Sequence, residues 1–170
     1  QSSAQALTRA RKSERRYATL FNEAPMMYLT VRDEGGTPII TDCNAAFFRN
    51  LGYPREQVVG QPLTRFYTPQ SRPALLEEGG FQRALRNEVT TPIERELVAQ
   101  DGRIIHTLFQ VAPDVDEAGQ SIGVLAMGLD ITERKQAEDA LRESQERLQA
   151  ILDNTTLLVY VKNLEGRFTF

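Results

Sequence analysis

The sequence predicts an α+β fold, in which one five-stranded antiparallel sheet carries short helices on one face and is flanked by an N-terminal and a C-terminal helix. Three observations support this. Two strand-like segments come first, several short helical segments follow, and three further strand-like segments come last. Because helices and strands are segregated along the chain rather than alternating, an antiparallel sheet is favoured over a parallel one.

The composition fits a globular domain. Of the 170 residues, 41% are hydrophobic, and the net charge of −3 gives no general attraction to nucleic acid or anionic lipid. The longest apolar runs are far shorter than the roughly 20 residues of a membrane-spanning helix. The only cysteine, Cys43, cannot form a disulfide within the chain. We therefore expect a cytoplasmic segment without direct membrane insertion, cut from a longer protein that could itself be membrane-anchored.

Residues 1–22 are expected to form an amphipathic helix. Apolar residues recur at helical spacing up to Phe21, and arginines and a lysine occupy the remaining surface. Glu14 interrupts this basic run and aromatic residues are not interleaved with it, so a solvated helix face is favoured over a nucleic-acid site. Ala24-Pro25 is expected to end the helix.

Residues 23–132 contain the predicted sheet. A first hairpin consists of strands Met26–Val31 and Pro38–Thr41. Asn44 is expected to cap a short helix, Ala45–Leu51, and shorter helical pieces follow up to Leu85. Three strands complete the sheet, with a hairpin signal between the first two and a loop at 113–120 before the last: Ile93–Ala99, Ile104–Ala112 and Ile122–Ile131.

The last strand leads directly into a charged helical segment. Residues 133–152 contain neither glycine nor proline, which predicts a long exposed helix. Either Thr132 or Asp130 could cap it, because both side chains can accept from amides of a helix's first turn. The sequence does not choose between them.

Several short motifs resemble the PAS domain, a sensory module of bacterial signalling proteins. They occur in the family's order and agree with the strands and helices inferred above. They are Asn44-Ala45-Ala46-Phe47, Gly52-Tyr53, Gly60, Asp101-Gly102-Arg103 and the C-terminal, PAC-type signature Asp130-Ile131-Thr132-Glu133-Arg134-Lys135.

The resemblance implies a role in signalling. The chain would belong to a multi-domain protein such as a sensor histidine kinase or a diguanylate cyclase. It would relay the state of a ligand or partner to an output domain in the same chain. In related domains the Asp130 position can pair with a base at the Arg103 position, so Arg103, Asp130 and Thr132 are the candidate relay residues. The alternative is a ligand-free module for dimerisation and spacing.

A modest apolar pocket is the candidate ligand site. Comparison with flavin-binding relatives places its candidate residues on the inner face, with small side chains on the last strand leaving room. They are Phe47, Thr107, Phe109, Val124, Ala126 and Gly128. A small apolar ligand could fit there. In the opposing interpretation, large side chains such as Phe66 and Tyr67 fill the space, because protein cores are close-packed.

No cofactor is identified from the sequence. Flavin-binding relatives need a cysteine in the region of Gly60–Phe66 and a glutamine where this chain has Gly128, and both are missing. Haem-binding relatives need a helical histidine, whereas the only histidine, His106, is expected on a strand and outward-facing. A lone histidine with one cysteine also makes no metal cluster. We expect neither flavin, haem nor metal here.

The segment is not expected to be an enzyme. It has no glycine-rich phosphate loop, no nucleophile with a histidine partner, and no acidic pair in an apolar setting. Any catalytic domain would lie elsewhere in the parent protein.

The C-terminal helix carries a weak heptad-like seam, which predicts a homodimer through the two flanking helices. Leu141, Leu148 and Ile151 belong to this seam, together with less apolar residues. Alternatively, the helix packs against its own domain. At a shift of 131 residues, 147–153 and 165–166 resemble 16–22 and 34–35, so we expect residues 153–170 to begin a second, truncated PAS-like unit with strands at 157–161 and 167–170.

Overall fold

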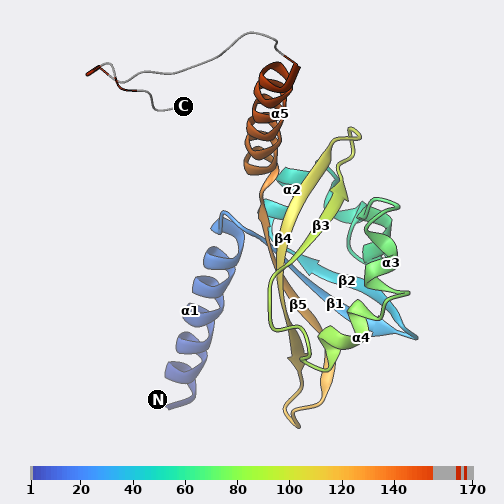
Figure 1. Ribbon diagram of the computed structural model, residues 1–170. Helices are drawn as coiled ribbons and strands as arrows, with labels where there is room; N and C mark the ends of the chain where they lie inside the picture. Colours follow the sequence, from blue (N-terminus) through green and yellow to red (C-terminus); the bar gives the residue numbers. More distant parts are fainter. Residues whose placement is uncertain (1, 155–163, 166, 168–170) are drawn as a thin grey trace. The chain divides into compact units, whose positions relative to one another are not determined.

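The computed structural model describes residues 2–154, 164, 165 and 167 and confirms the predicted α+β fold (Figure 1). The chain divides into two compact units, residues 1–132 and 133–170. The strands are β1 (Met27–Glu34), β2 (Thr37–Cys43), β3 (Ile93–Val98), β4 (Ile104–Val115) and β5 (Ser121–Asp130). The helices are α1 (Ser2–Glu23), α2 (Ala45–Leu51), η1 (Arg55–Gln57), η2 (Leu63–Phe66), α3 (Arg72–Leu75), α4 (Gly80–Leu85) and α5 (Thr132–Asn154).

The five strands form one antiparallel sheet in the order β2-β1-β5-β4-β3. The last strand, β5, therefore lies in the centre, where it pairs with both β1 and β4. A central strand is bonded along both edges, so a displacement of β5 disturbs two ladders of hydrogen bonds rather than one.

One face of the sheet forms the core with α2, η2, α3 and α4. Successive side chains of a strand point to opposite faces, and on β4 the buried positions are Ile105, Thr107 and Phe109. The inward placing of Thr107 and Phe109 agrees with what the resemblance implied. Phe47 from α2 meets Phe66 from η2 edge to face, with ring centroids 6.4 Å apart. Full burial of a phenylalanine contributes about 1.5–3 kcal/mol, so these two rings are a substantial part of the core.

Strand β4 is longer than the sequence predicted. The expected loop at 113–120 is wrong at its start, because β4 continues through Pro113, which pairs with Val124 of β5. The reason lies in the pairing with β3, which reaches only as far as Phe109. Beyond that residue one side of β4 is an open edge, where the missing amide hydrogen of a proline breaks no ladder.

Helix α5 belongs to the second unit from Glu133 onward. Its surface carries ion pairs between neighbouring turns, such as Arg147 with Glu143 at 3.3 Å. The seam residues Leu141, Leu148 and Ile151 are each about 60% exposed. Dimerisation through this helix stays a prediction. The strands expected at 157–161 and 167–170 lie outside the described residues, apart from Arg167.

None of the described helices is both long enough and apolar enough to cross a membrane.

Candidate functional site

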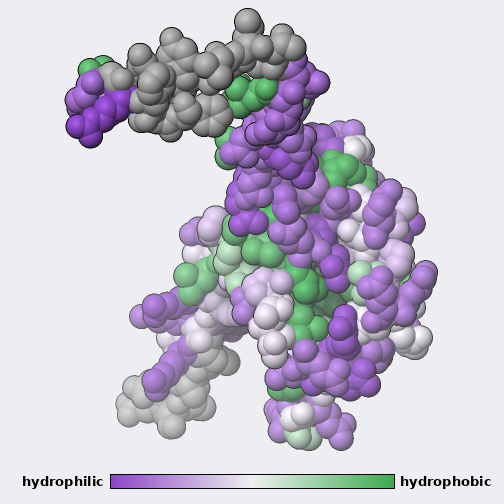
Figure 2. Space-filling view, viewed as in Figure 1, coloured by the Kyte–Doolittle hydropathy of each residue, from purple (hydrophilic) through white to green (hydrophobic). Residues whose placement is uncertain are grey.

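A small cavity lies between the inner face of the sheet and α4. It encloses about 40 Å³. Its walls include Phe109, Val124 and Ala126, three of the predicted pocket residues, together with Phe81 and Ala84 of α4. Figure 2 shows apolar surface over the middle of this unit. The cavity is therefore mostly apolar, as a pocket for a small organic molecule would be.

The other pocket candidates lie elsewhere in the core. Phe47 and Thr107 are fully buried but do not line the cavity. The expectation that Gly128 leaves room is wrong, because the rings and methyls of neighbouring residues fill that space. A Cβ atom on Gly128 would lie 2.7 Å from Phe109 Cε1 and 2.8 Å from Thr107 Cγ2. Glycine is needed there because Phe109 and Thr107 pack directly on the strand.

The charged residue of the cavity, Arg95, was not among the residues expected there. It lies on β3 between Ile93 and Leu97, and the alternation of that strand places it on the inner face. Its Nη1 atom donates to the backbone oxygen of Glu94 at 2.7 Å, and its Nε atom is buried. Tyr67 also lines the cavity. Burial raises the pKa of the Tyr67 phenol, and the nearby charge of Arg95 acts in the opposite direction.

A group of hydrogen bonds joins β4 to the point where β5 ends and α5 begins. We call His106, Asp130, Ile131 and Thr132 the C-terminal joint. The amide of Ile131 donates to the His106 oxygen at 2.8 Å, and the amide of His106 donates to Thr132 Oγ1 at 3.0 Å. Asp130 Oδ1 accepts from the Thr132 amide at 2.9 Å. The Thr132 hydroxyl therefore binds strand β4, while Asp130 binds the first amide of the helix.

Two side chains near this joint have partners that the sequence did not identify. Arg103 Nε donates to Asp101 Oδ2 at 2.7 Å. This bond is the main cause of the raised pKa of Arg103, and the charge of Asp130 makes the smallest contribution to it. The expected Arg103–Asp130 pairing is thus replaced by a bond within the β3–β4 hairpin, where the two residues are neighbours. His106 faces outward as expected, with Nδ1 3.7 Å from Glu96 Oε1.

Asn44 holds together a second junction, where α1, β1 and α2 meet at the same end of the sheet as the end of β5. Its buried side chain caps α2 through the Phe47 amide at 3.2 Å, as predicted. It also accepts from the Tyr28 amide at 2.9 Å and donates to the oxygens of Phe21 at 2.8 Å and Met26 at 2.9 Å. We call these five residues the N-terminal joint. The cap could be predicted from the sequence, but the bonds to α1 and β1 could not.

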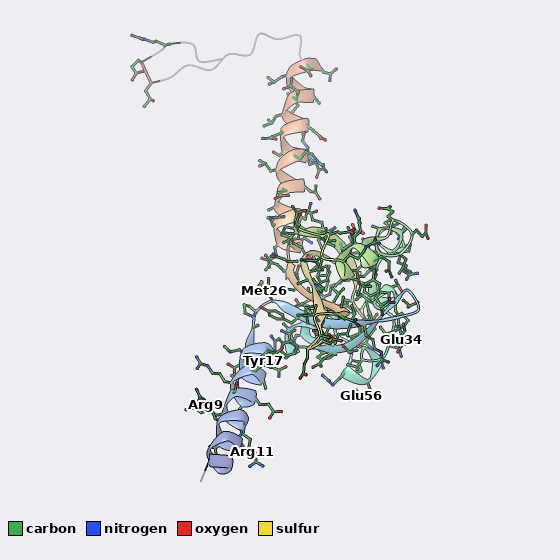
Figure 3. The ribbon with its side chains drawn as sticks, turned by 90° about the horizontal axis from the view of Figure 1, so that it is seen from below. Arg9, Arg11, Tyr17, Met26, Glu34 and Glu56 are labelled. Carbon is green, nitrogen blue, oxygen red and sulfur yellow. The ribbon has the colours of Figure 1, made fainter. Side chains whose placement is uncertain are left out.

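A groove of about 300 Å³ lies between α1 and the outer face of the sheet. Tyr17 and Phe21 of α1 form one wall, and outward residues such as Leu125 and Met127 form the other. Figure 3 shows Tyr17 on the part of α1 next to the strands, with Arg9 and Arg11 farther toward the N-terminus. Tyr17 and Leu125 are 68% and 43% exposed, so this groove leaves apolar surface uncovered in the single chain.

Cys43 is buried against the N-terminal joint, as expected for a structural thiol. Burial, with a smaller effect of Asp42, raises the pKa of the thiol to about 12 against the opposing charge of Arg55. Within the described part of the chain, no group of three or more His, Cys, Asp or Glu side chains could hold a metal ion.

Comparison with known proteins identifies this architecture. Residues 15–131 match the family model described as the PAS fold. The aerobic respiration control sensor protein ArcB of Escherichia coli is 29% identical over 116 residues, which are 68% of this chain and 14% of ArcB. The chain thus spans only a small part of that relative.

Solved structures agree on the fold. A sensory box histidine kinase/response regulator from Burkholderia thailandensis has a TM-score of 0.57 at 21% identity, covering 79% of this chain and 98% of that one. An RNA-binding light-oxygen-voltage receptor has a TM-score of 0.61 at 21% identity, covering 84% of this chain and 37% of the receptor.

Proposed function

The chain belongs to the PAS family, and we propose that it relays the state of a ligand or partner through β5 and α5 to an output domain of a longer signalling protein. The observation that carries this proposal is the C-terminal joint. There, three hydrogen bonds of 2.8–3.0 Å connect the start of α5 to the sheet. A change in the position of β5 or β4 would alter these bonds and hence the start of the helix.

The cavity and this joint are connected by neighbouring contacts, which supports the proposed direction of the signal. Tyr67 lines the cavity, and Thr68 follows it in the chain. The Thr68 hydroxyl donates to Glu96 Oε2 at 3.0 Å, and the other oxygen of Glu96 lies near His106. His106 then donates to Thr132. A ligand that moved Tyr67 could therefore change the hydrogen bonds at the beginning of α5.

The free energies involved suit a switch. A single hydrogen bond contributes about 0.5–1.5 kcal/mol, which is small compared with the stability of a domain. Two helix orientations that differ by a few kcal/mol would nevertheless change population several-fold when one such bond is lost. The relay would therefore bias two states without unfolding the sheet.

For the output domain we propose a histidine kinase, with a diguanylate cyclase as the second choice. The names of ArcB, a sensor protein, and of the Burkholderia kinase support this order. We propose no catalytic role for residues 1–170, no nucleic-acid partner and a cytoplasmic location. We also propose neither flavin nor haem as cofactor. The filled space beside Gly128 supports the absence of flavin, since a longer side chain at that position would meet Phe109.

The test is the output of the parent protein carrying Thr132→Val or Thr132→Ser. Valine has nearly the shape of threonine but cannot accept from the His106 amide, whereas serine retains the hydroxyl. We expect Thr132→Val to change the ratio of stimulated to basal output, and Thr132→Ser to resemble the unaltered protein. If the unaltered protein and both variants had equal basal output and equal stimulated output, the C-terminal joint would not carry the signal.

A ligand-free dimerisation and spacing module is the second candidate. The groove beside α1 favours it, because Tyr17, Leu20 and Leu125 remain exposed in the single chain. A second copy of the chain could cover them. Sedimentation of the chain with and without residues 1–22 would test this, since a monomer at high concentration in both forms excludes dimerisation through α1. Residues 133–152 can be removed in the same way to test α5.

A further inference from the structure

Helix α1 carries a concentration of positive charge that the net charge of the chain does not reveal. Residues 2–23 hold five basic and two acidic side chains, a net +3, whereas residues 24–132 hold nine basic and fourteen acidic ones, a net −5. The basic residues lie within about two turns of the helix. They are Arg9, Arg11, Lys12, Arg15 and Arg16. A partner that meets α1 therefore meets a basic surface on an otherwise acidic unit.

These five side chains are exposed and have no acidic partner. Each is open to solvent, and none forms an ion pair or hydrogen bond with another described residue. The arginines of the other long helix differ in this respect. On α5, Arg142 pairs with Asp139 at 2.9 Å and Arg147 with Glu143 at 3.3 Å. The positive charge of α1 is therefore available to an external anion, while that of α5 is largely balanced on its own surface.

Helical spacing gathers the five basic residues on one side of α1. At 3.6 residues per turn this side lies opposite Tyr17 and Phe21, which line the groove against the sheet. Arg11, Lys12 and Arg15 border the same shallow surface hollow, as residues on one side should. Glu14 interrupts the basic run in the sequence, but its position on the helix falls on the side of Tyr17. We call the side with the five basic residues the basic face.

We propose that the basic face of α1 binds an anionic phospholipid surface. Headgroup phosphates would accept hydrogen bonds from the guanidinium groups and from the lysine ammonium. Leu20 lies one turn after Arg16, is 65% exposed, and does not line the groove. It would reach the boundary between headgroups and acyl chains while the helix lies parallel to the surface. The contact is peripheral, since no segment crosses the bilayer.

A lipid surface fits the basic face better than a nucleic acid does. Proteins hold single strands by stacking bases on aromatic side chains, and the two aromatic residues of α1, Tyr17 and Phe21, lie on the groove side. Binding to a duplex gains affinity from each further phosphate contact, whereas the rest of the unit is acidic. A plane of anionic headgroups requires only a row of positive charges, and it also accommodates an exposed leucine.

Binding at α1 would position the sheet as well as the helix. Asn44 donates to the Phe21 oxygen at 2.8 Å and so connects the last turns of α1 to β1 and α2. A helix held on a membrane surface would therefore hold the entry side of the sheet there. This inference goes beyond the proposed relay and does not depend on it.

The experiment is sedimentation of the purified chain with sucrose-loaded vesicles in sodium chloride. Anionic vesicles contain phosphatidylcholine and phosphatidylglycerol in a 70:30 ratio, and neutral vesicles contain phosphatidylcholine alone. We expect binding to the anionic vesicles only. The binding should be lost when the salt rises from 0.1 M to 1 M, because the screening length falls from about 10 Å to about 3 Å. A 20-base-pair duplex DNA, added at an equal concentration of negative charge, should compete weakly.

Charge-removing variants test whether the basic face is responsible. The triple variant Arg9→Gln, Lys12→Gln, Arg16→Gln retains good helix formers at exposed positions, so its melting temperature should be unchanged. Each basic residue at an anionic surface contributes about fivefold to the binding constant, so affinity should fall about a hundredfold.

The matched control removes the same charge from the other exposed helix. Arg134→Gln, Arg142→Gln, Arg147→Gln gives the chain the same net charge as the triple variant in α1. It should bind anionic vesicles nearly as well as the unaltered chain. Leu20→Ser should weaken binding severalfold, because it removes the apolar contact and keeps every charge.

Four results would overturn the lipid proposal. They are equal binding to neutral vesicles, binding that persists at 1 M salt, equal affinity of the two triple variants, and tighter binding of the duplex DNA than of the anionic vesicles. The last result would assign the basic face to nucleic acid. Unchanged affinity in Leu20→Ser would overturn the placement of α1 at the headgroup boundary. The relay is judged separately, by the output of the Thr132 variants.

Discussion

The two joints of the sheet domain use the same chemistry in different surroundings. At the N-terminal joint a single buried amide, Asn44, binds four backbone groups from α1, β1 and α2. At the C-terminal joint the bonds are divided between the exposed Asp130 and the partly buried Thr132. Water can replace a bond at the second joint far more easily than at the first. An anchored entry helix and an adjustable exit helix would fit the proposed relay.

The strongest test of this difference is Asn44→Ala. We expect the free energy of unfolding to fall by about 2–4 kcal/mol, because four backbone groups lose a hydrogen-bond partner around a fully buried side chain. Urea denaturation measures this loss. Asn50→Ala is the matched control, since Asn50 lies on the same helix and its side chain bonds only the Ala46 oxygen, at 2.8 Å. A loss no greater than that of Asn50→Ala would contradict the central role of Asn44.

A second test uses the titration of Cys43, which adjoins Asn44. Its pKa rises from 9.0 to about 12 on folding, mainly because the thiol is buried. The neutral thiol therefore stabilises the folded state fully below pH 9, and this stability is lost as the pH rises toward 12. The free energy of unfolding should fall with a slope of at most about 1.4 kcal/mol per pH unit from this group.

Comparison with Cys43→Ala isolates the thiol's part of the slope. A residual slope is expected in that variant, because Tyr67 also has a raised pKa. If the slope above pH 9 were the same in both proteins, the region around Asn44 would be open to solvent, and the two joints would be less different than proposed.

Thr132→Val should have a smaller effect on stability, about 1 kcal/mol, because only the His106 amide loses its acceptor. Hydrogen exchange should show faster exchange at the His106 amide, with little change at Tyr28 in the other joint. Thr132→Ser should retain the slow exchange. Uniformly faster exchange across β1 would mean that the two joints open together rather than independently.

The smallest effect on stability is expected for Asp130→Ala, at about 0–1 kcal/mol, because the Asp130 side chain is exposed to water. Its effect should appear in signalling, as a changed basal or stimulated output of the parent protein. Asp101→Ala removes another exposed carboxylate of the same domain, bound to Arg103, and should leave output unchanged. Unchanged output in both variants would exclude Asp130 from the relay.

The order of the helices and strands could be predicted because it depends on local patterns. The alternation of apolar and polar residues predicted β3, and Asp101-Gly102 predicted the turn that leads to β4. Asn44 predicted the start of α2. At the end of α2, Gly52 adopts the left-handed conformation, with φ of 75°, that a helix-ending glycine favours. The prediction of a loop from Pro113 onward was wrong, because proline is ordinarily a sign of a loop. Pro113 is tolerated in β4 because β3 no longer pairs with that part of the strand.

The candidate site was predictable only in part. The resemblance to flavin-binding relatives implied the inward positions on β4 and β5, and three of the six proposed pocket residues line the cavity. Arg95 was overlooked because a charged residue in an alternating strand is ordinarily assigned to the solvent face. The partner of Arg103 was also misjudged, because the resemblance suggested Asp130 while Asp101 lies two positions away in the same turn.

The sequence by itself determined the order of the helices and strands and the place where the sheet passes into the C-terminal helix. These depend on residue type and spacing over a few neighbouring positions. Only the tertiary structure decided that the room beside Gly128 is filled, that Thr132 binds β4, and that Asn44 connects three elements. Each of these depends on atoms from segments that are distant along the chain, and their distances are set by the packing of the sheet.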